Sequence, residues 1–188
     1  PPGTYTVTIN ANSAGAPSAK TQTLSLTVTA LPDYILTATA GSQSTLVNQS
    51  LQLPGTMTAV NGYASVVNLS CTGAPPPTCT VSPSSLTPTA GGAAFTVTVS
   101  SSTATTYNFN ITAVGTDGSS ITHSAAVTLT VNGDFSVGAS NSTQSVLAGQ
   151  TASYPLDFAP IGGSTFSSAV TYSCSGLPAL TSCSFTPS

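Results

Sequence analysis

Residues 70–84 read Ser-Cys-Thr-Gly-Ala-Pro-Pro-Pro-Thr-Cys-Thr-Val-Ser-Pro-Ser, and residues 173–188 read Ser-Cys-Ser-Gly-Leu-Pro-Ala-Leu-Thr-Ser-Cys-Ser-Phe-Thr-Pro-Ser. Both stretches follow the pattern Ser-Cys-x-Gly-x-Pro, a short turn, and then Cys-x-apolar-x-Pro-Ser. Cys71 and Cys174 are 103 residues apart, and Cys79 and Cys183 are 104 apart. Because this spacing is the size of one small β domain, the period predicts a tandem repeat.

The four cysteines form two close pairs, Cys71 with Cys79 and Cys174 with Cys183. A zinc site does not fit this spacing, and the single histidine of the chain cannot complete two such sites. We therefore predict two disulfides, each closing a small loop, and with them an oxidising compartment. Four buried free thiols are the alternative.

Segments that alternate apolar and polar residues lie on both sides of the cysteine loops. This period of two predicts half-buried strands, and no segment shows a helical period. Strands separated by Gly, Pro and Ser breaks indicate a β-sandwich. Pro54-Gly55 lies inside one such segment and indicates an edge strand or a bulge there. The predicted strands are 5–9, 24–28, 34–38, 51–57, 66–71, 79–81, 95–99, 107–111 and 127–131.

The order of these segments divides the chain into three parts. Residues 33–132 form one complete unit. Residues 133–188 form the first half of a further unit, because Asp134-Phe135 repeats Asp33-Tyr34 and 170–174 repeats 67–71. Residues 1–32 supply the last two strands of a unit, because 5–9 matches 107–111 and 24–28 matches 127–131.

Two half-units alone would leave apolar sheet faces uncovered, and a two-stranded sheet is marginal in water. Two explanations stay open at this point. Neighbouring copies complete each other head to tail through strand complementation, which gives an open filament. Alternatively, the chain is part of a longer tandem polypeptide whose adjacent repeats are covalent. Pro1-Pro2-Gly3 is not the start of a signal peptide, so we expect a processed chain or a part of a longer one.

Only 3% of the residues are charged, against about 25% in ordinary globular proteins. The chain has one lysine (Lys20), no arginine and no basic patch that would neutralise phosphates, which excludes nucleic acid as a partner. No apolar run approaches the roughly 20 residues that span a bilayer, so we expect no membrane insertion in this segment. The four carboxylates are Asp33, Asp117, Asp134 and Asp157.

The cysteine motifs, the Thr-Pro-x-x-Gly-Gly before an alternating strand, the Gly-Thr-Tyr-Thr-Val-Thr-Ile strand and a final Leu-Thr-Val together resemble bacterial Ig-like repeat domains. The matching segments are 71–84, 87–99, 3–9 and 129–131. The resemblance implies tandem Ig-like antiparallel β-sandwiches, one complete unit flanked by two partial units. Such repeats occur in large secreted and cell-surface proteins, where they serve as stalks, adhesins, filament subunits and spacers. The family supplies no catalytic residues to carry over.

Three polar residues, His123, Asp33 and Asp134, are candidate sites. His123 could be combined with Asp117 in a Ser-His-Asp arrangement, but no nucleophile elbow supports this, and we interpret His123 as an exposed turn residue. Asp33 and Asp134 recur at the repeat boundary; a calcium clip needs more ligands than one carboxylate per junction, so both are interpreted as turn or strand-start residues.

Four asparagines head Asn-x-Ser/Thr sequons and are candidate glycosylation acceptors: Asn48, Asn68, Asn110 and Asn141. Asn110 alternates with apolar neighbours and is expected to face solvent. Seven aromatics are interpreted as core residues rather than as sugar-stacking platforms: Tyr5, Tyr34, Tyr107, Phe109, Phe135, Tyr172 and Phe185.

The sequence thus predicts an extracellular or cell-surface structural protein with no catalytic residue, metal or cofactor. We expect a segment of a filament, stalk or adhesin that contacts copies of itself or adjacent covalent repeats, with surface glycans as a further expected partner. The alternative is a carbohydrate-binding or spacer module of a secreted polysaccharide-acting enzyme, which a cluster of exposed, coplanar aromatics would favour.

Overall fold

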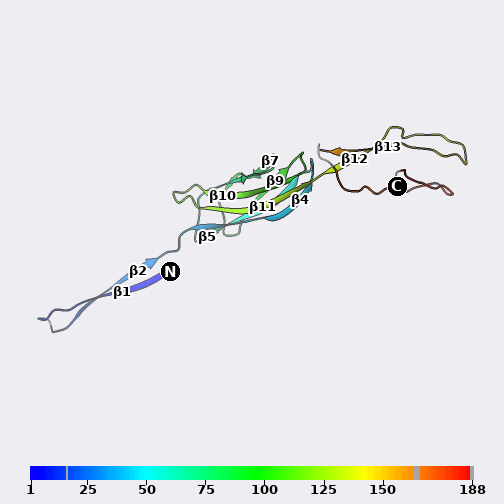
Figure 1. Cartoon of the computed structure of the whole chain (residues 1–188). Helices are drawn as coiled ribbons and strands as arrows, with labels where there is room; N and C mark the ends of the chain where they lie inside the picture. Colours follow the sequence, from blue (N-terminus) through cyan, green and yellow to red (C-terminus); the bar gives the residue numbers. More distant parts are fainter. Residues whose placement is uncertain (16, 163–165, 187–188) are drawn as a thin grey trace.

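The structure, a computed structural model, describes residues 1–15, 17–162 and 166–186 of the 188. Within these residues the chain is built from strands, turns and loops, without helices. Figure 1 shows a string of three parts: a two-stranded hairpin at the N-terminal end, a β-sandwich in the middle, and a second hairpin followed by loops at the C-terminal end. The predicted all-β class is confirmed.

The central sandwich consists of two sheets, and neighbouring strands are antiparallel except that β4 runs parallel to β11. One sheet has the order β3-β5-β9-β7 and the other the order β4-β11-β10-β6-β8. The strands are β3 (Asp33–Ala38), β4 (Gly41–Leu46), β5 (Leu51–Val60), β6 (Val67–Gly73), β7 (Thr78–Ser82), β8 (Ser85–Leu86), β9 (Ala93–Ser100), β10 (Thr106–Gly115) and β11 (Thr122–Asn132).

The core lies between these two sheets and follows from the alternation in the sequence. In β9 and β10 every second side chain is buried and the residues between are half-buried or exposed. Leu53 and Val97 from one sheet and Ile111 and Leu129 from the other are fully buried. Burial of each such side chain is worth about 1.5–3 kcal/mol, so this two-sided core is what stabilises the sandwich.

Gly55 lies on the core face of β5, directly opposite Phe95 of β9. The Phe95 ring occupies the space where a Cβ at position 55 would stand, so no other residue fits there without moving the ring. Phe95 is 3% exposed, and the absence of a side chain at position 55 leaves room for its ring over β5.

The expectation that Pro54 marks an edge strand or a bulge is wrong: β5 lies between β3 and β9 in a regular ladder. The carbonyl of Pro54 accepts from the N–H of Thr39, just beyond the last residue of β3. The imide nitrogen of Pro54 therefore faces a side on which the neighbouring strand has ended, so the missing N–H removes no bond of the ladder.

The strands of the complete unit lie where the alternation predicts them, and the sequence missed β4 and β8. Residues 170–174 repeat β6 in sequence but form no strand. In the complete unit β6 is paired by β10 and β8. Residues 170–174 have no such neighbours among the described residues, and a strand needs a partner to satisfy its backbone groups.

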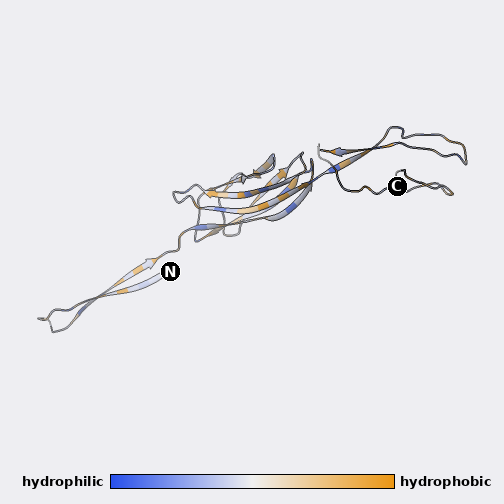
Figure 2. Cartoon of the chain, in the orientation of Figure 1, coloured by the Kyte–Doolittle hydropathy of each residue, from blue (hydrophilic) through white to orange (hydrophobic). Residues whose placement is uncertain are grey.

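The two hairpins extend away from the sandwich at opposite ends. β1 (Gly3–Ala11) pairs with β2 (Lys20–Val28), and β12 (Asp134–Ala139) pairs with β13 (Leu156–Ile161). Figure 2 shows hydrophobic positions on these strands as well as on the strands of the sandwich. In the hairpins, however, the second sheet that would cover such positions is missing from the described residues.

Candidate assembly surface

The N-terminal hairpin carries a row of exposed apolar side chains on one face. Cross-strand pairs in its register bring together Tyr5 with Leu26 and Val7 with Leu24. Because strand residues two apart share a face, Ile9 and Val28 lie on the same side. These six side chains are between 39% and 53% exposed.

This hairpin has the same pairing register as β10 and β11 of the complete sandwich. Tyr5 faces Leu26 as Tyr107 faces Leu129, and Val7 faces Leu24 as Phe109 faces Val127. The equivalent positions differ in burial: Leu26 is 53% exposed and Leu129 is 0% exposed. The hairpin therefore has the pairing of two strands that form part of the core in the complete unit, but its own apolar side chains are exposed.

The C-terminal hairpin repeats the first strand pair of the sandwich. Asp134 pairs with Ile161 as Asp33 pairs with Val60, each displaced by 101 residues, and the match continues to the other end of the ladder. In the complete unit the face of this strand pair is covered, with Tyr34 1% and Met57 0% exposed. The equivalent of Met57 is Phe158, which is 40% exposed.

A row of aromatic rings lies on this open C-terminal face. The ring centroids of Phe158 and Tyr172 are 5.3 Å apart and those of Tyr172 and Phe185 are 5.2 Å apart. Phe135 and Phe166 stack at 4.8 Å with a 50° tilt, which repeats the Tyr34–Tyr63 pair of the complete core at 5.0 Å and 60°. The rings are tilted against one another, as is typical of packed cores, rather than coplanar.

The prediction that aromatics belong to the core holds for Tyr34 and Phe109, which are 1% and 3% exposed. Tyr5, at the equivalent of half-buried Tyr107, is 39% exposed, and Tyr172, at the equivalent of Leu69, is 37% exposed. The difference has one physical cause, since these two residues occupy core-type positions on faces that lack the second sheet.

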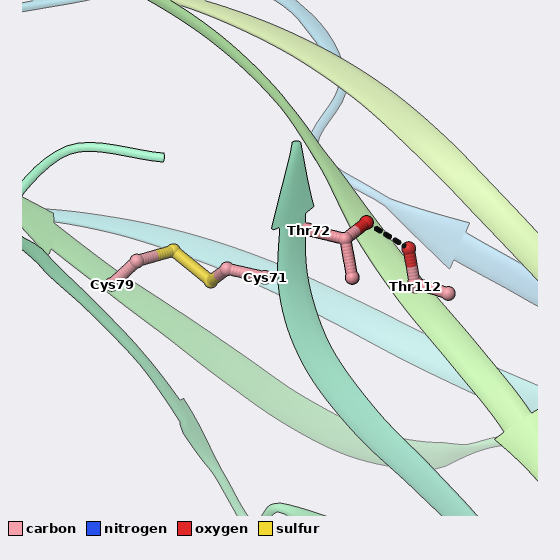
Figure 3. Close-up of a disulfide and its surroundings, with 4 residues drawn as sticks. All are labelled: Cys71, Thr72, Cys79 and Thr112. Atoms are coloured by element: carbon pink, nitrogen blue, oxygen red, sulfur yellow. Dashed lines mark hydrogen bonds between the residues drawn. A yellow bond between two sulfur atoms is a disulfide. The ribbon is translucent and has the colours of Figure 1, made fainter. Parts of the chain in front are cut away.

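The structure joins both cysteine pairs in disulfides, Cys71–Cys79 and Cys174–Cys183, with Cα atoms 6.3 and 6.4 Å apart. Cys71 is in β6 and Cys79 in β7, so the first disulfide links the two sheets (Figure 3). On the opposite side of β6, Thr72 Oγ1 lies 2.7 Å from Thr112 Oγ1 of β10. The Pro-Ser that closes the second motif, Pro187-Ser188, lies outside the described residues.

Removing the inter-sheet disulfide should weaken the sandwich measurably. Replacing Cys71 and Cys79 together by alanine is expected to lower the free energy of unfolding by about 2.5 kcal/mol, because an open nine-residue loop gains entropy in the unfolded chain. Urea unfolding of the variant and the parent protein measures the difference. Equal midpoints with equal slopes would contradict this expectation.

His123 is not the exposed turn residue predicted from the sequence, because β11 begins at Thr122 and includes it. Its Nε2 donates to Asp33 Oδ1 at 2.9 Å, and its ring lies edge-on to Tyr34 with centroids 4.9 Å apart. The carboxylate beside it is that of Asp33, not Asp117. Asp33 begins β3, as expected of a strand-start residue, and also accepts from the N–H of Tyr34 at 2.7 Å.

The hydrogen bond from His123, with the N–H of Tyr34, holds the pKa of Asp33 below its usual value. A lowered carboxyl pKa stabilises the fold above the unfolded-state value, and this is lost as the pH falls through the folded-state value. Asp33→Asn is therefore expected to destabilise the sandwich at pH 7 by less than about 1 kcal/mol, since the pair is half-exposed. The difference from the parent should shrink as the pH is lowered from 7 to 2, and a difference of equal size at both values would contradict the pair's role.

The four sequon asparagines lie at different depths. Asn48, Asn68 and Asn141 are exposed, whereas Asn110, expected to face solvent, is half-buried on β10.

The described residues contain no group of three or more His, Cys, Asp or Glu side chains that would hold a metal ion. In the same part of the chain, no helix has the length and apolar character needed to cross a bilayer.

No family model and no curated protein match the chain. Among solved structures, domains 4 and 5 of the S-layer protein SbsC align with 70% of this chain and 66% of that one, at 20% identity and a TM-score of 0.41. Domains 1–6 of the surface layer protein SbsC align with 83% of this chain and 25% of that one, at 18% identity and a TM-score of 0.40. The chain thus spans less than two thirds of the length of either structure, and similarity at this level assigns neither family nor function.

Proposed function

We propose that this chain is a structural, non-catalytic segment of an extracellular filament, stalk or adhesin, in which β-sandwich repeats follow one another end to end. In this proposal a second copy covers the open half-sandwiches: the β1–β2 hairpin of one copy packs on the C-terminal half-unit of another. The observation that carries the proposal is the repeated pairing register. The β1–β2 hairpin keeps the pairing of β10 with β11, and the β12–β13 hairpin keeps the pairing of β3 with β5. Each half-unit therefore lacks the strand pair that the other half-unit contains.

The apolar pattern of the two open faces supports this pairing. On the C-terminal face, Phe158 and Tyr172 take the positions of Met57 and Leu69 of the complete core. On the N-terminal hairpin, Val7 and Leu24 take the positions of Phe109 and Val127. Cores tolerate hydrophobic exchanges of this kind when the pattern is kept.

The order of strands supports an Ig-like unit. The sequence β3-β5-β9-β7 corresponds to the four-stranded A-B-E-D sheet of Ig domains, and β6, β10 and β11 correspond to strands C, F and G. Two small disulfide loops fit an oxidising, extracellular compartment.

A joint of two half-units is less complete than the central sandwich. Neither half-unit supplies a counterpart of β8 or of β9, and β9 lies between β5 and β7 in the complete unit. We therefore expect the joint to be weaker than the core of the complete unit and to dissociate on dilution.

Sedimentation velocity of the full chain between about 1 and 100 µM, with electron microscopy of the concentrated sample, tests the proposal. We expect the mean size to grow with concentration and the particles to be thin, beaded and unbranched, as for a repeated head-to-tail contact. A chain that stays monomeric throughout would overturn completion by a second copy. Closed dimers that do not grow would overturn the linear arrangement.

The carbohydrate-binding alternative predicts coplanar exposed aromatics. The exposed rings on the C-terminal half are instead tilted by 59° between Phe158 and Tyr172 and by 31° between Tyr172 and Phe185. They also stand at positions whose equivalents in the complete unit belong to the core, which favours the structural role.

A further inference from the structure

The complete sandwich contains one ion pair where the last strand of the unit meets the first. His123 of β11 and Asp33 of β3 come from elements at the two ends of the unit's sequence, and their side chains meet at 2.9 Å. In the ladder of β10 and β11, His123 stands opposite Ala113. The pair therefore shows how the last two strands of the unit, β10 and β11, are placed along the first two, β3 and β5.

The two half-units carry the counterparts of this pair on opposite ends of the molecule. In the β1–β2 ladder, the residue opposite Ala11 is Lys20, so Lys20 is the equivalent of His123. Asp134 is the equivalent of Asp33, and its Oδ1 accepts from the next N–H at 2.8 Å as the Oδ1 of Asp33 does at 2.7 Å. The two half-units thus carry a cation, Lys20, and a carboxylate, Asp134, at the positions of His123 and Asp33 in the complete unit.

We propose that Lys20 of one copy binds Asp134 of the next copy and fixes the register of the head-to-tail joint. This inference rests on the proposed function and names one contact that sets how the two copies are aligned in the joint. Lys20 shares the face of Leu24 and Leu26, because it is an even number of residues from both. Its aliphatic stem lies along the ring of Phe135, as His123 lies against Tyr34, and its ammonium reaches the carboxylate.

The charge composition makes this placement specific. Lys20 is the only lysine or arginine among 188 residues, and there are only four carboxylates. Figure 1 places β2 and β12 at opposite ends of the sandwich, so Lys20 and Asp134 of the same copy do not meet. A contact between two copies brings them together in the same geometry that the complete unit uses.

The single lysine allows a direct test on the unmodified chain. A zero-length carbodiimide cross-linker, added to the full chain at about 100 µM, joins an amine to a carboxylate only where the two are in contact. We expect covalent oligomers whose peptide map contains a Lys20–Asp134 isopeptide bond. Lys20→Arg keeps the charge but cannot react, and Asp134→Asn removes the acceptor, so neither variant should yield this bond.

Sedimentation of the same samples separates the two proposals. Oligomers that form in solution but link Lys20 to another aspartate, or form no link, would overturn the Lys20–Asp134 contact and leave the assembly intact. A chain that is monomeric and unlinked would overturn both. Oligomers with the expected bond support both.

Charge reversal provides a second, independent readout. Lys20→Asp alone and Asp134→Lys alone are each expected to weaken assembly about three- to tenfold, because attraction becomes repulsion at a partly exposed site. The chain with both substitutions should assemble within about twofold of the parent. Thr21→Asp, on the opposite face of the same strand, is the control and should change assembly less than twofold. A double variant as weak as the single variants would contradict the contact.

Discussion

Replacing Leu26 by lysine is expected to abolish assembly of the chain into linear oligomers. Leu26 lies in the middle of the exposed apolar face of the β1–β2 hairpin, 53% exposed in the single copy. Covering a leucine is worth about 1.5–3 kcal/mol, and covering an unpaired ammonium instead is strongly unfavourable. Together these effects should weaken the joint on the order of a hundredfold or more, as measured by sedimentation across a concentration series.

Thr27→Lys is the matched control for this experiment. It adds the same charge to the neighbouring residue, whose side chain lies on the opposite face of the strand. Assembly of this variant should resemble that of the parent. If Leu26→Lys assembles as well as Thr27→Lys, the apolar face of the hairpin does not form the joint.

The second large effect concerns two leucines at equivalent positions. Leu129→Ala is expected to lower the free energy of unfolding of the sandwich by about 2–5 kcal/mol, because Leu129 is 0% exposed and its removal leaves a cavity. Leu26→Ala, studied at concentrations where the chain is monomeric, should change it by less than about 0.5 kcal/mol.

Urea unfolding of both variants under the same conditions measures this contrast. The slope with denaturant should stay constant, which shows that only stability has changed. Equal losses for the two variants would mean that the hairpin is covered within its own copy, contrary to the exposed face described above. At assembling concentrations Leu26→Ala should lose part of the oligomers, which separates a role in the joint from a role in the fold.

The strands of the complete unit could be predicted because their apolar residues alternate with Thr and Ser, and that pattern is imposed by burial on one face. β4 gave no such signal. Its sequence from Gly41 to Leu46 is mostly polar on both faces, and it is held by parallel pairing with β11, a long-range contact that no local pattern records. β8 is only two residues long and depends on β6 for its bonds.

The repeat relation could also be found in the sequence, but its electrostatic part was missed. The polar run before Ile121 resembles a turn, and it hid the fact that the ladder with β10 extends to Thr122 and places His123 on the core-facing side. The match of 24–28 with 127–131 already aligns Lys20 with His123 in the sequence. The sequence does not show that His123 meets Asp33, because this contact joins β11 to β3 across 90 residues of chain.

The contact between the Phe95 ring and Gly55 helps to keep neighbouring repeats from exchanging strands while they fold. At the position equivalent to Gly55, the C-terminal half-unit has Leu156, whose side chain fills the space that such a ring requires. A strand like β9 that reached the adjacent half-unit during folding would meet a steric clash there. Strand exchange between similar neighbours is a common failure of repeat proteins. A single glycine-to-leucine difference therefore makes one wrong pairing between adjacent repeats unfavourable, while each repeat keeps the same backbone plan.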